Sequence, residues 1–125
     1  MIVVTRYTVA EPDGDDFLQR AQAALQALAA RPGYLGGRVG RAVEDPSVWV
    51  ITTEWEGVGA YRRSLSAYDV KVHATPLLSL AHDEPSAFEV LHADGPGAPA
   101  ASRSRRAADA GQVAVGEASA PVVPR

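Results

Sequence analysis

Cysteine is absent from this 125-residue chain, which excludes a disulfide-stapled scaffold and a thiolate metal site. The same absence suits a reducing compartment, so we expect a cytoplasmic protein. No apolar run has the length of a membrane span, and the first residues have the pattern of a strand rather than of a signal peptide. Positive charge is scarce as well: 12 Lys and Arg stand against 15 Asp and Glu. We therefore expect neither a membrane nor a nucleic acid as a partner.

Aromatic residues are few, and their distribution divides the chain. All eight precede residue 92, and residues 93–125 also lack Leu and Ile. That last segment consists mainly of Ala, Gly, Pro and Ser with scattered charge, and it cannot bury enough apolar surface to offset the entropy lost on ordering. The sequence predicts one domain over residues 1–92 and a disordered tail over residues 93–125.

The first part of the domain alternates between strand and helix patterns. Residues 2–10 are β-branched and roughly alternating, which predicts a strand. Residues 17–31 carry apolar side chains at the spacing of an amphipathic helix, and Pro32-Gly33 ends it. The stripe consists of Phe17, Ala21, Ala24, Leu25 and Leu28.

A glycine-rich segment, residues 33–44, follows that helix and leads through Asp45-Pro46 into the apolar residues 48–56. A dinucleotide-binding loop places its glycines between a strand and a helix, whereas this segment follows a helix and precedes a strand. We therefore predict a β-hairpin, with Gly36, Gly37 and Gly40 marking a bulge or the close approach of another group.

The remainder of the domain completes the fold. Residues 57–84 have the pattern of a helix broken into pieces, and residues 86–91 that of a short strand. The order β-α-β-β-α-β predicts an α+β, ferredoxin-like fold with a four-stranded antiparallel sheet and helices on one face. Because Val48 and Val50 alternate with Trp49 and Ile51, both faces of the sheet are apolar, and we expect a second copy to cover the open face in a homodimer.

Three short motifs give the domain a family resemblance. They are Pro32-Gly33-Tyr34 at the helix end, Glu54-Trp55 at the close of the strand, and Tyr61 on the next helix. Residues 1–92 resemble the antibiotic biosynthesis monooxygenase family of dimeric α+β barrels. The resemblance implies a homodimer that oxidises a small aromatic, polyketide- or quinol-like compound with dioxygen, without flavin, metal or other cofactor.

Candidate site residues are the aromatic and basic side chains that such chemistry needs. The protein would bind an apolar ring, help to remove a proton and stabilise the anion. We predict Tyr7, Trp55 and Tyr61 as substrate-binding residues and His73 and Tyr68 as catalytic residues, with His73 as the base. The three histidines lack the spacing of a metal site.

Two further functions stay open at this stage. The first is a non-catalytic barrel that binds a small ligand without turnover. The second is a structural dimer in which residues 93–125 are the functional segment.

Overall fold

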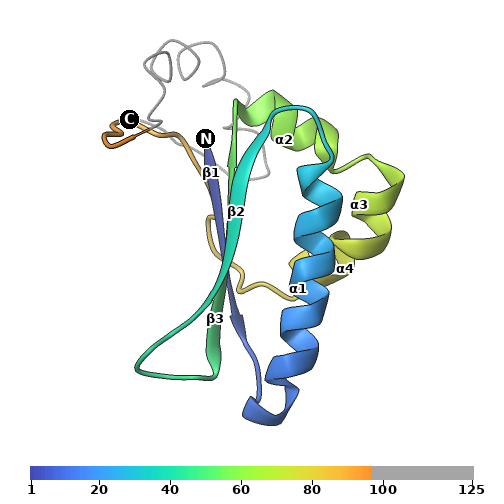
Figure 1. Ribbon diagram of the computed structural model, residues 1–125, viewed down its shortest axis with the longest axis vertical. Helices are drawn as coiled ribbons and strands as arrows, with labels where there is room; N and C mark the ends of the chain where they lie inside the picture. The colour runs from blue at the N-terminus through green and yellow to red at the C-terminus, as the bar shows by residue number, and fades with distance from the viewer. Residues whose placement is uncertain (97–125) are drawn as a thin grey trace.

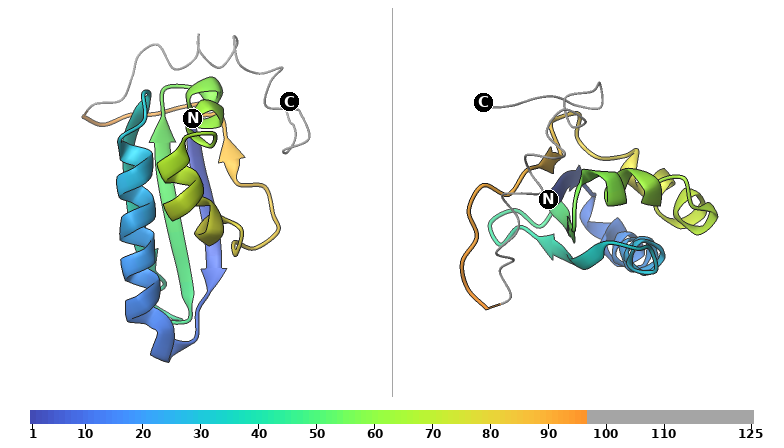
Figure 2. Two further views of the ribbon diagram at one scale, coloured as in Figure 1. Left: turned by 90° about the vertical axis from the view of Figure 1, so that its right-hand side faces the viewer. Right: turned by 90° about the horizontal axis from the view of Figure 1, so that it is seen from above.

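The computed structural model describes residues 1–96, so most of the predicted tail lies outside the described residues. Four antiparallel strands form one sheet in the order β2-β3-β1-β4, and the helices cover one of its faces (Figure 1). Seen from above, the sheet and the helices form two separate layers (Figure 2). This is the predicted ferredoxin-like α+β fold. Among the described residues, no helix is both long and apolar enough to cross a membrane.

The elements follow the predicted order, with different bounds. The strands are β1 (Ile2–Thr8), β2 (Tyr34–Arg41), β3 (Val48–Trp55) and β4 (Ala87–Phe88). A single 3-10 turn (Glu11–Asp13) precedes α1 (Gly14–Ala29). The second helical region is broken, as expected, into α2 (Val58–Ser64), α3 (Tyr68–His73) and α4 (Thr75–Leu78).

Helix α1 forms because its apolar residues recur on one face. Phe17, Ala21, Ala24 and Leu28 are buried against the sheet, while Leu25 is only half-buried. The small alanines allow the helix to lie close to the strands. Gly33 follows the helix with a φ of 88°, a conformation that glycine adopts without strain. A side chain at Gly33 would also collide with Ala60 on α2.

Strands β1 and β3 show strict alternation of burial. Val3, Thr5 and Tyr7 face the helices from β1, and the facing residues of β3 are Trp49, Ile51, Thr53 and Trp55. In the register of the two strands Thr5 lies opposite Ile51 and Tyr7 opposite Trp49. These side chains and the stripe of α1 make up most of the hydrophobic core.

The glycines of β2 serve two different purposes. The register with β3 shifts between Tyr34 and Gly36, which is the predicted bulge, and an added Cβ at Gly36 would meet nothing within 4 Å. An added Cβ at Gly37 would instead collide with the Tyr34 hydroxyl and lie 2.9 Å from Leu25 Cδ2. The groups that approach Gly37 are thus side chains of the same chain.

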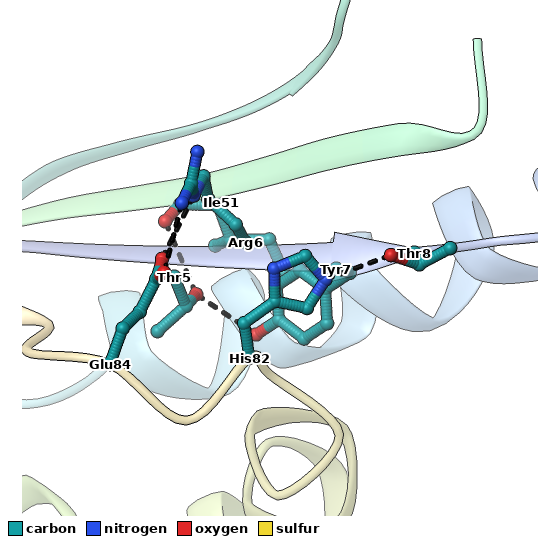
Figure 3. A network of polar contacts seen from close by, with 7 residues as sticks. All are labelled: Thr5, Arg6, Tyr7, Thr8, Ile51, His82 and Glu84. Atoms are coloured by element: carbon teal, nitrogen blue, oxygen red, sulfur yellow. Dashed lines mark hydrogen bonds and ion pairs between the residues drawn. The ribbon is translucent and has the colours of Figure 1, made fainter. Parts of the chain in front are cut away.

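The last strand is much shorter than predicted, since only Ala87 and Phe88 pair with β1. The segment before it lies along β1 through other contacts (Figure 3). The Arg6 guanidinium donates to both carboxylate oxygens of Glu84 at 2.8 and 2.9 Å, and the Arg6 carbonyl accepts from the His82 N–H at 2.8 Å. His82 Nε2 also lies 2.8 Å from the Thr8 hydroxyl. The Val4 N–H also donates to the Ser86 carbonyl at 2.7 Å, so backbone contact with β1 continues before β4. The strand ends early because Phe88 lies opposite Ile2, and residues 90 and 91 would extend past the start of β1.

The sheet face away from the helices carries the alternate residues of the same strands. Ile2, Val4, Val48 and Val50 are half-buried there, and Phe88 is 43% exposed. Polar side chains share this face with them, namely Arg6, Thr8, Arg38, Thr52 and Glu54. The face is therefore mixed, with an apolar centre along β1 and β3, and it is less apolar than the sequence analysis suggested.

Candidate functional site

The three predicted substrate-binding residues come together on the helix-facing side of the sheet. Tyr7 belongs to β1, Trp55 ends β3 and Tyr61 lies on α2. Trp55 and Tyr7 are 0% and 1% exposed, whereas Tyr61 is only partly buried. Solvent reaches this group at Tyr61.

Tyr7 and Trp55 start from opposite ends of the paired strands and lean toward each other. The Tyr7 hydroxyl lies 2.9 Å from the Thr5 hydroxyl, and Trp55 Nε1 donates to the Thr53 hydroxyl at 2.9 Å. Each aromatic side chain therefore points back along its own strand. Because Thr5 pairs with Ile51 and Thr53 lies two residues further along β3, the two threonines are diagonal neighbours on the sheet.

Ring contacts extend the group across the sheet. The ring centroids of Trp55 and Tyr61 are 5.6 Å apart, and those of Trp55 and Tyr34 are 5.2 Å apart in an edge-to-face arrangement. Both distances lie in the range of favourable aromatic pairs. Trp55 is thus the centre of a Tyr34–Trp55–Tyr61 cluster that joins β2, β3 and α2.

Burial keeps the phenols of this site protonated. It raises the pKa of Tyr61, and the neighbouring Tyr7 adds to the rise because two phenolates would repel each other. Burial also raises the pKa of Tyr7, while the hydrogen bond with Thr5 offsets part of the rise by stabilising the phenolate. Both side chains are neutral hydrogen-bonding groups at neutral pH.

A second aromatic set lies nearer the N-terminal end of α1. The Phe17 ring lies 5.1 Å from the rings of both Tyr7 and Trp49, and the Arg41 guanidinium lies 5.4 Å from the Trp49 centroid. That distance is within reach of a cation–π interaction. Tyr7 therefore connects this set, which is core packing, with the Trp55–Tyr61 group.

The two predicted catalytic residues lie elsewhere on the surface. Tyr68 begins α3 and is 78% exposed, and His73 ends the same helix and is exposed as well. The residue that anchors α3 in the core is Val70, which is 0% exposed. The assignment of Tyr68 and His73 as catalytic residues stays a prediction.

Sequence reasoning missed Thr5 and Thr53, the buried partners of the two aromatic side chains. Both occupy the pattern Thr-x-aromatic, in which alternate residues of a strand share a face. That pattern is visible in the sequence, but a threonine in a strand usually reflects β-propensity alone. Tyr34 was noted only as part of a motif, and its contact with Trp55 depends on the pairing of β2 with β3.

Within residues 1–96, no group of three or more His, Asp or Glu side chains is arranged to hold a metal ion. The polar atoms of the site described above come from tyrosine, threonine and tryptophan. Such atoms bind and orient an organic ring through hydrogen bonds and ring contacts.

Known proteins resemble the chain in both sequence and structure. A 42.8 kDa protein in the whiE locus of Streptomyces coelicolor is 26% identical over 93 residues, which are 74% of this chain and 23% of that protein. The chain thus spans about a quarter of the length of that curated relative.

Two solved structures illustrate the structural similarity. One is a variant of SnoaB, a cofactor-independent oxygenase from Streptomyces nogalater, with a TM-score of 0.56 and 25% identity, over 74% of this chain and 93% of that one. The other is a conserved protein from Methanosarcina mazei, with a TM-score of 0.56 and 20% identity, over 69% of this chain and 84% of that one.

The sequence pattern that defines one family settles the classification. The pattern of the antibiotic biosynthesis monooxygenases matches residues 1–74, which is more than half of the chain. This range contains β1 to α3, and therefore every residue of the aromatic site. The protein belongs to the antibiotic biosynthesis monooxygenase family.

Proposed function

We propose that the protein is a cofactor-independent monooxygenase that oxidises a small aromatic, polyketide- or quinol-like compound with dioxygen. The observation that carries the proposal is the convergence of Trp55 with two protonated tyrosines between the sheet and the helices. Family membership and the likeness to SnoaB support it.

The proposed reaction needs few functional groups from the protein. An electron-rich phenolate or enolate supplies all four electrons that reduce dioxygen, so that a ring CH₂ and O₂ give a carbonyl group and water. The chain has to bind the ring, stabilise the anion and exclude water. We assign ring binding to Trp55 and a hydrogen bond to the developing anion to Tyr61, whose raised pKa keeps its proton in place. Tyr7 is assigned to the inner end of the site.

Removal of the substrate proton needs a base, and His73 remains our candidate, with Tyr68 at the opposite end of α3. Both are exposed in the single chain. They would take part only if substrate or a second subunit covers α3, and their variants therefore test the assignment directly.

Oxygen uptake with anthrones and naphthols, measured with the full chain, tests the function. We expect consumption that is insensitive to a chelator, and a kcat at least about tenfold lower in Tyr61→Phe if its hydroxyl stabilises the transition state by a hydrogen bond to charge. Asp69→Asn on the exposed side of α3 is the matched surface control. Unchanged turnover in His73→Ala and Tyr68→Phe would remove those two residues from the mechanism.

The alternative is a barrel that binds an aromatic ligand without turnover. It is favoured by the near-complete burial of Trp55 and Tyr7, whose side chains pack as a core does. Recovery of a bound aromatic compound from purified protein, together with no oxygen consumption for any compound tested, would decide for this alternative.

We also propose that a second copy covers the open sheet face. The support is the apolar centre formed by Ile2, Val4, Val48 and Val50 with the exposed Phe88 beside it. Monomeric proteins seldom leave a broad apolar sheet face to solvent. A twofold pair would bury it sheet against sheet. Sedimentation at micromolar concentration tests this, and a stable monomer would refute it.

A further inference from the structure

The loop between β2 and β3 carries the most exposed of the large apolar side chains in residues 1–96. Val43 lies two residues after the end of β2 and is 98% exposed. The loop projects from the end of the hairpin on the side away from the helices (Figure 1). It therefore places an apolar contact group on the same side of the molecule as the open sheet face.

The opposite end of that face carries exposed apolar side chains as well. Thr8 lies opposite Val48 beside the loop, so β1 begins at the end of the sheet farthest from the loop. At that end Ile2 pairs with Phe88, which is 43% exposed, and Leu91 follows with 62% exposed. We call Ile2, Phe88 and Leu91 the far-end patch. The loop and the far-end patch thus lie at opposite ends of one face.

Charge distinguishes the two ways in which a second copy could stack on this face. A twofold axis parallel to the strands brings the two loops together, whereas an axis across the strands places each loop over the far end of the other copy. Each loop carries the exposed carboxylates of Glu44 and Asp45, so the first arrangement gathers four negative charges. The far end carries Arg38 and Glu54, whose charges cancel. Charge therefore favours the axis across the strands.

Arg38 is available for a contact with such a partner. It is exposed and takes part in no ion pair within residues 1–96, and the same is true of Glu44. Gly36 lies two residues before Arg38 on the same face, and an added Cβ there would meet nothing within 4 Å. The absence of a side chain at Gly36 leaves space beside the guanidinium. The two charges can therefore meet without the loss of an existing contact.

We propose that the β2–β3 loop sets the orientation of self-association: Val43 of one copy packs against the far-end patch of its partner, and Glu44 pairs with Arg38 of the partner subunit. The inference rests on the proposed pairing of open faces and adds which ends of the two sheets meet. It does not depend on the proposed oxygenase activity.

Reversal of one charge tests the orientation, because the two arrangements predict opposite signs. Sedimentation equilibrium of the full chain at low ionic strength gives the dissociation constant of the dimer. Glu44→Arg and Arg38→Glu should each raise it about tenfold, since each of two equivalent ion pairs becomes a repulsion. An equimolar mixture of the two variants should regain the wild-type affinity, because both ion pairs re-form in the mixed dimer. A tighter dimer in Glu44→Arg, or no recovery in the mixture, would overturn the proposal.

Val43→Ala tests the apolar contact. It removes two carbon atoms from each of two equivalent contacts and should raise the dissociation constant about tenfold or more. Val72→Ala on α3 makes the same change at an exposed position of the helix layer, and Glu11→Arg makes the same charge reversal before α1. Both controls should dimerise as the wild-type protein does, and circular dichroism checks that every variant is folded. An effect of Val43→Ala no larger than that of Val72→Ala would overturn the proposal.

The outcomes separate this inference from the pairing on which it rests. A wild-type chain that stays monomeric at micromolar concentration would refute both. A dimer that dissociates in Val50→Asp but keeps its affinity in Val43→Ala and Glu44→Arg would overturn the orientation alone and leave the pairing of open faces standing.

Discussion

The two faces of the sheet are built from the same strands, and they differ in how much of their burial one chain completes. On the helix-facing side, Trp49, Ile51 and Trp55 are buried under α1 and α2. On the other side, Val48 and Val50 alternate with them and are only half-buried. The single chain buries one face, which holds the aromatic site, whereas the other face keeps apolar area that folding of this chain does not remove from water. The strand pattern thus encodes a core on one face and, under the proposed pairing of two copies, an interface on the other.

Trp55→Ala should produce the largest effect, because Trp55 is fully buried and contacts two tyrosines. Truncating a buried aromatic residue costs about 3–5 kcal/mol of unfolding free energy. Urea denaturation at fixed protein concentration measures it. Val50→Ala, on the opposite face of the same strand, should cost clearly less, and an equal loss would remove the distinction between the two faces.

Val50→Asp should break the proposed pairing of open faces while leaving the helix-facing core intact. Burying an unpaired carboxylate between two subunits should weaken dimerisation by about 100-fold or more, which is 2.7 kcal/mol or more. Sedimentation equilibrium gives the dissociation constant, and circular dichroism checks the fold. Arg20→Asp on the exposed side of α1 should leave the dimer unchanged. A dimer equally stable in both variants would place the interface elsewhere.

Gly37→Ala should be destabilising where Gly36→Ala is not. The new methyl group would force Tyr34 and Leu25 aside, and overpacking of this kind costs about 1–3 kcal/mol. Gly36 has open space around the same position and a negative φ, so its alanine variant should be neutral or slightly stabilising. Thermal unfolding of the two variants side by side makes the comparison, and equal melting temperatures would contradict it.

Glu84→Gln should have the smallest effect, and one that depends on pH. The hydrogen bond from Arg6 holds the pKa of Glu84 below its ordinary value, and the charge of His82 contributes to the same direction. Since the folded pKa is the lower one, the stabilisation is present above the unfolded pKa of about 4.3 and is lost as the pH falls through the folded value. The variant should have a lower melting temperature than the wild-type protein at neutral pH, and the same melting temperature in strong acid.

Asp83→Asn controls for the loss of one negative charge in the same segment. Asp83 is exposed and adjacent to Glu84, so this variant should show no comparable pH-dependent difference. Identical profiles for the two variants would mean that the Arg6–Glu84 pair does not stabilise the segment along β1.

Much of the fold is predictable from the sequence because local patterns govern it. The stripe that begins with Phe17 predicts α1, and Gly33 with its positive φ lies where the helix was expected to end. The bulge near Gly36 was also predicted. The length of β4 was not, because it depends on the register with β1, in which Phe88 lies opposite Ile2 near the start of the chain. Local propensity carries no information about the register of distant strands.

The candidate site also has features that the sequence predicts and features that it does not. Tyr7, Trp55 and Tyr61 are identifiable by residue type and family resemblance, whereas their hydrogen-bonding character is not. The Thr5 hydroxyl, for example, contacts both the Tyr7 hydroxyl and the Ile51 carbonyl, which belongs to another strand. Tyr68 and His73 were chosen for their chemistry, and the fold places them on an exposed helix surface.

By itself, the sequence determined which segments become strand or helix and which family the chain belongs to, because periodicity and short motifs are properties of neighbouring residues. Tertiary structure alone decided which side chains meet. Strand register made Thr5 and Thr53 diagonal neighbours and placed the ring of Tyr34 against that of Trp55. It also left no space for a side chain at position 37. Contacts between distant residues arise only when long-range pairing fixes their positions, and the chemistry of the site lies in those contacts.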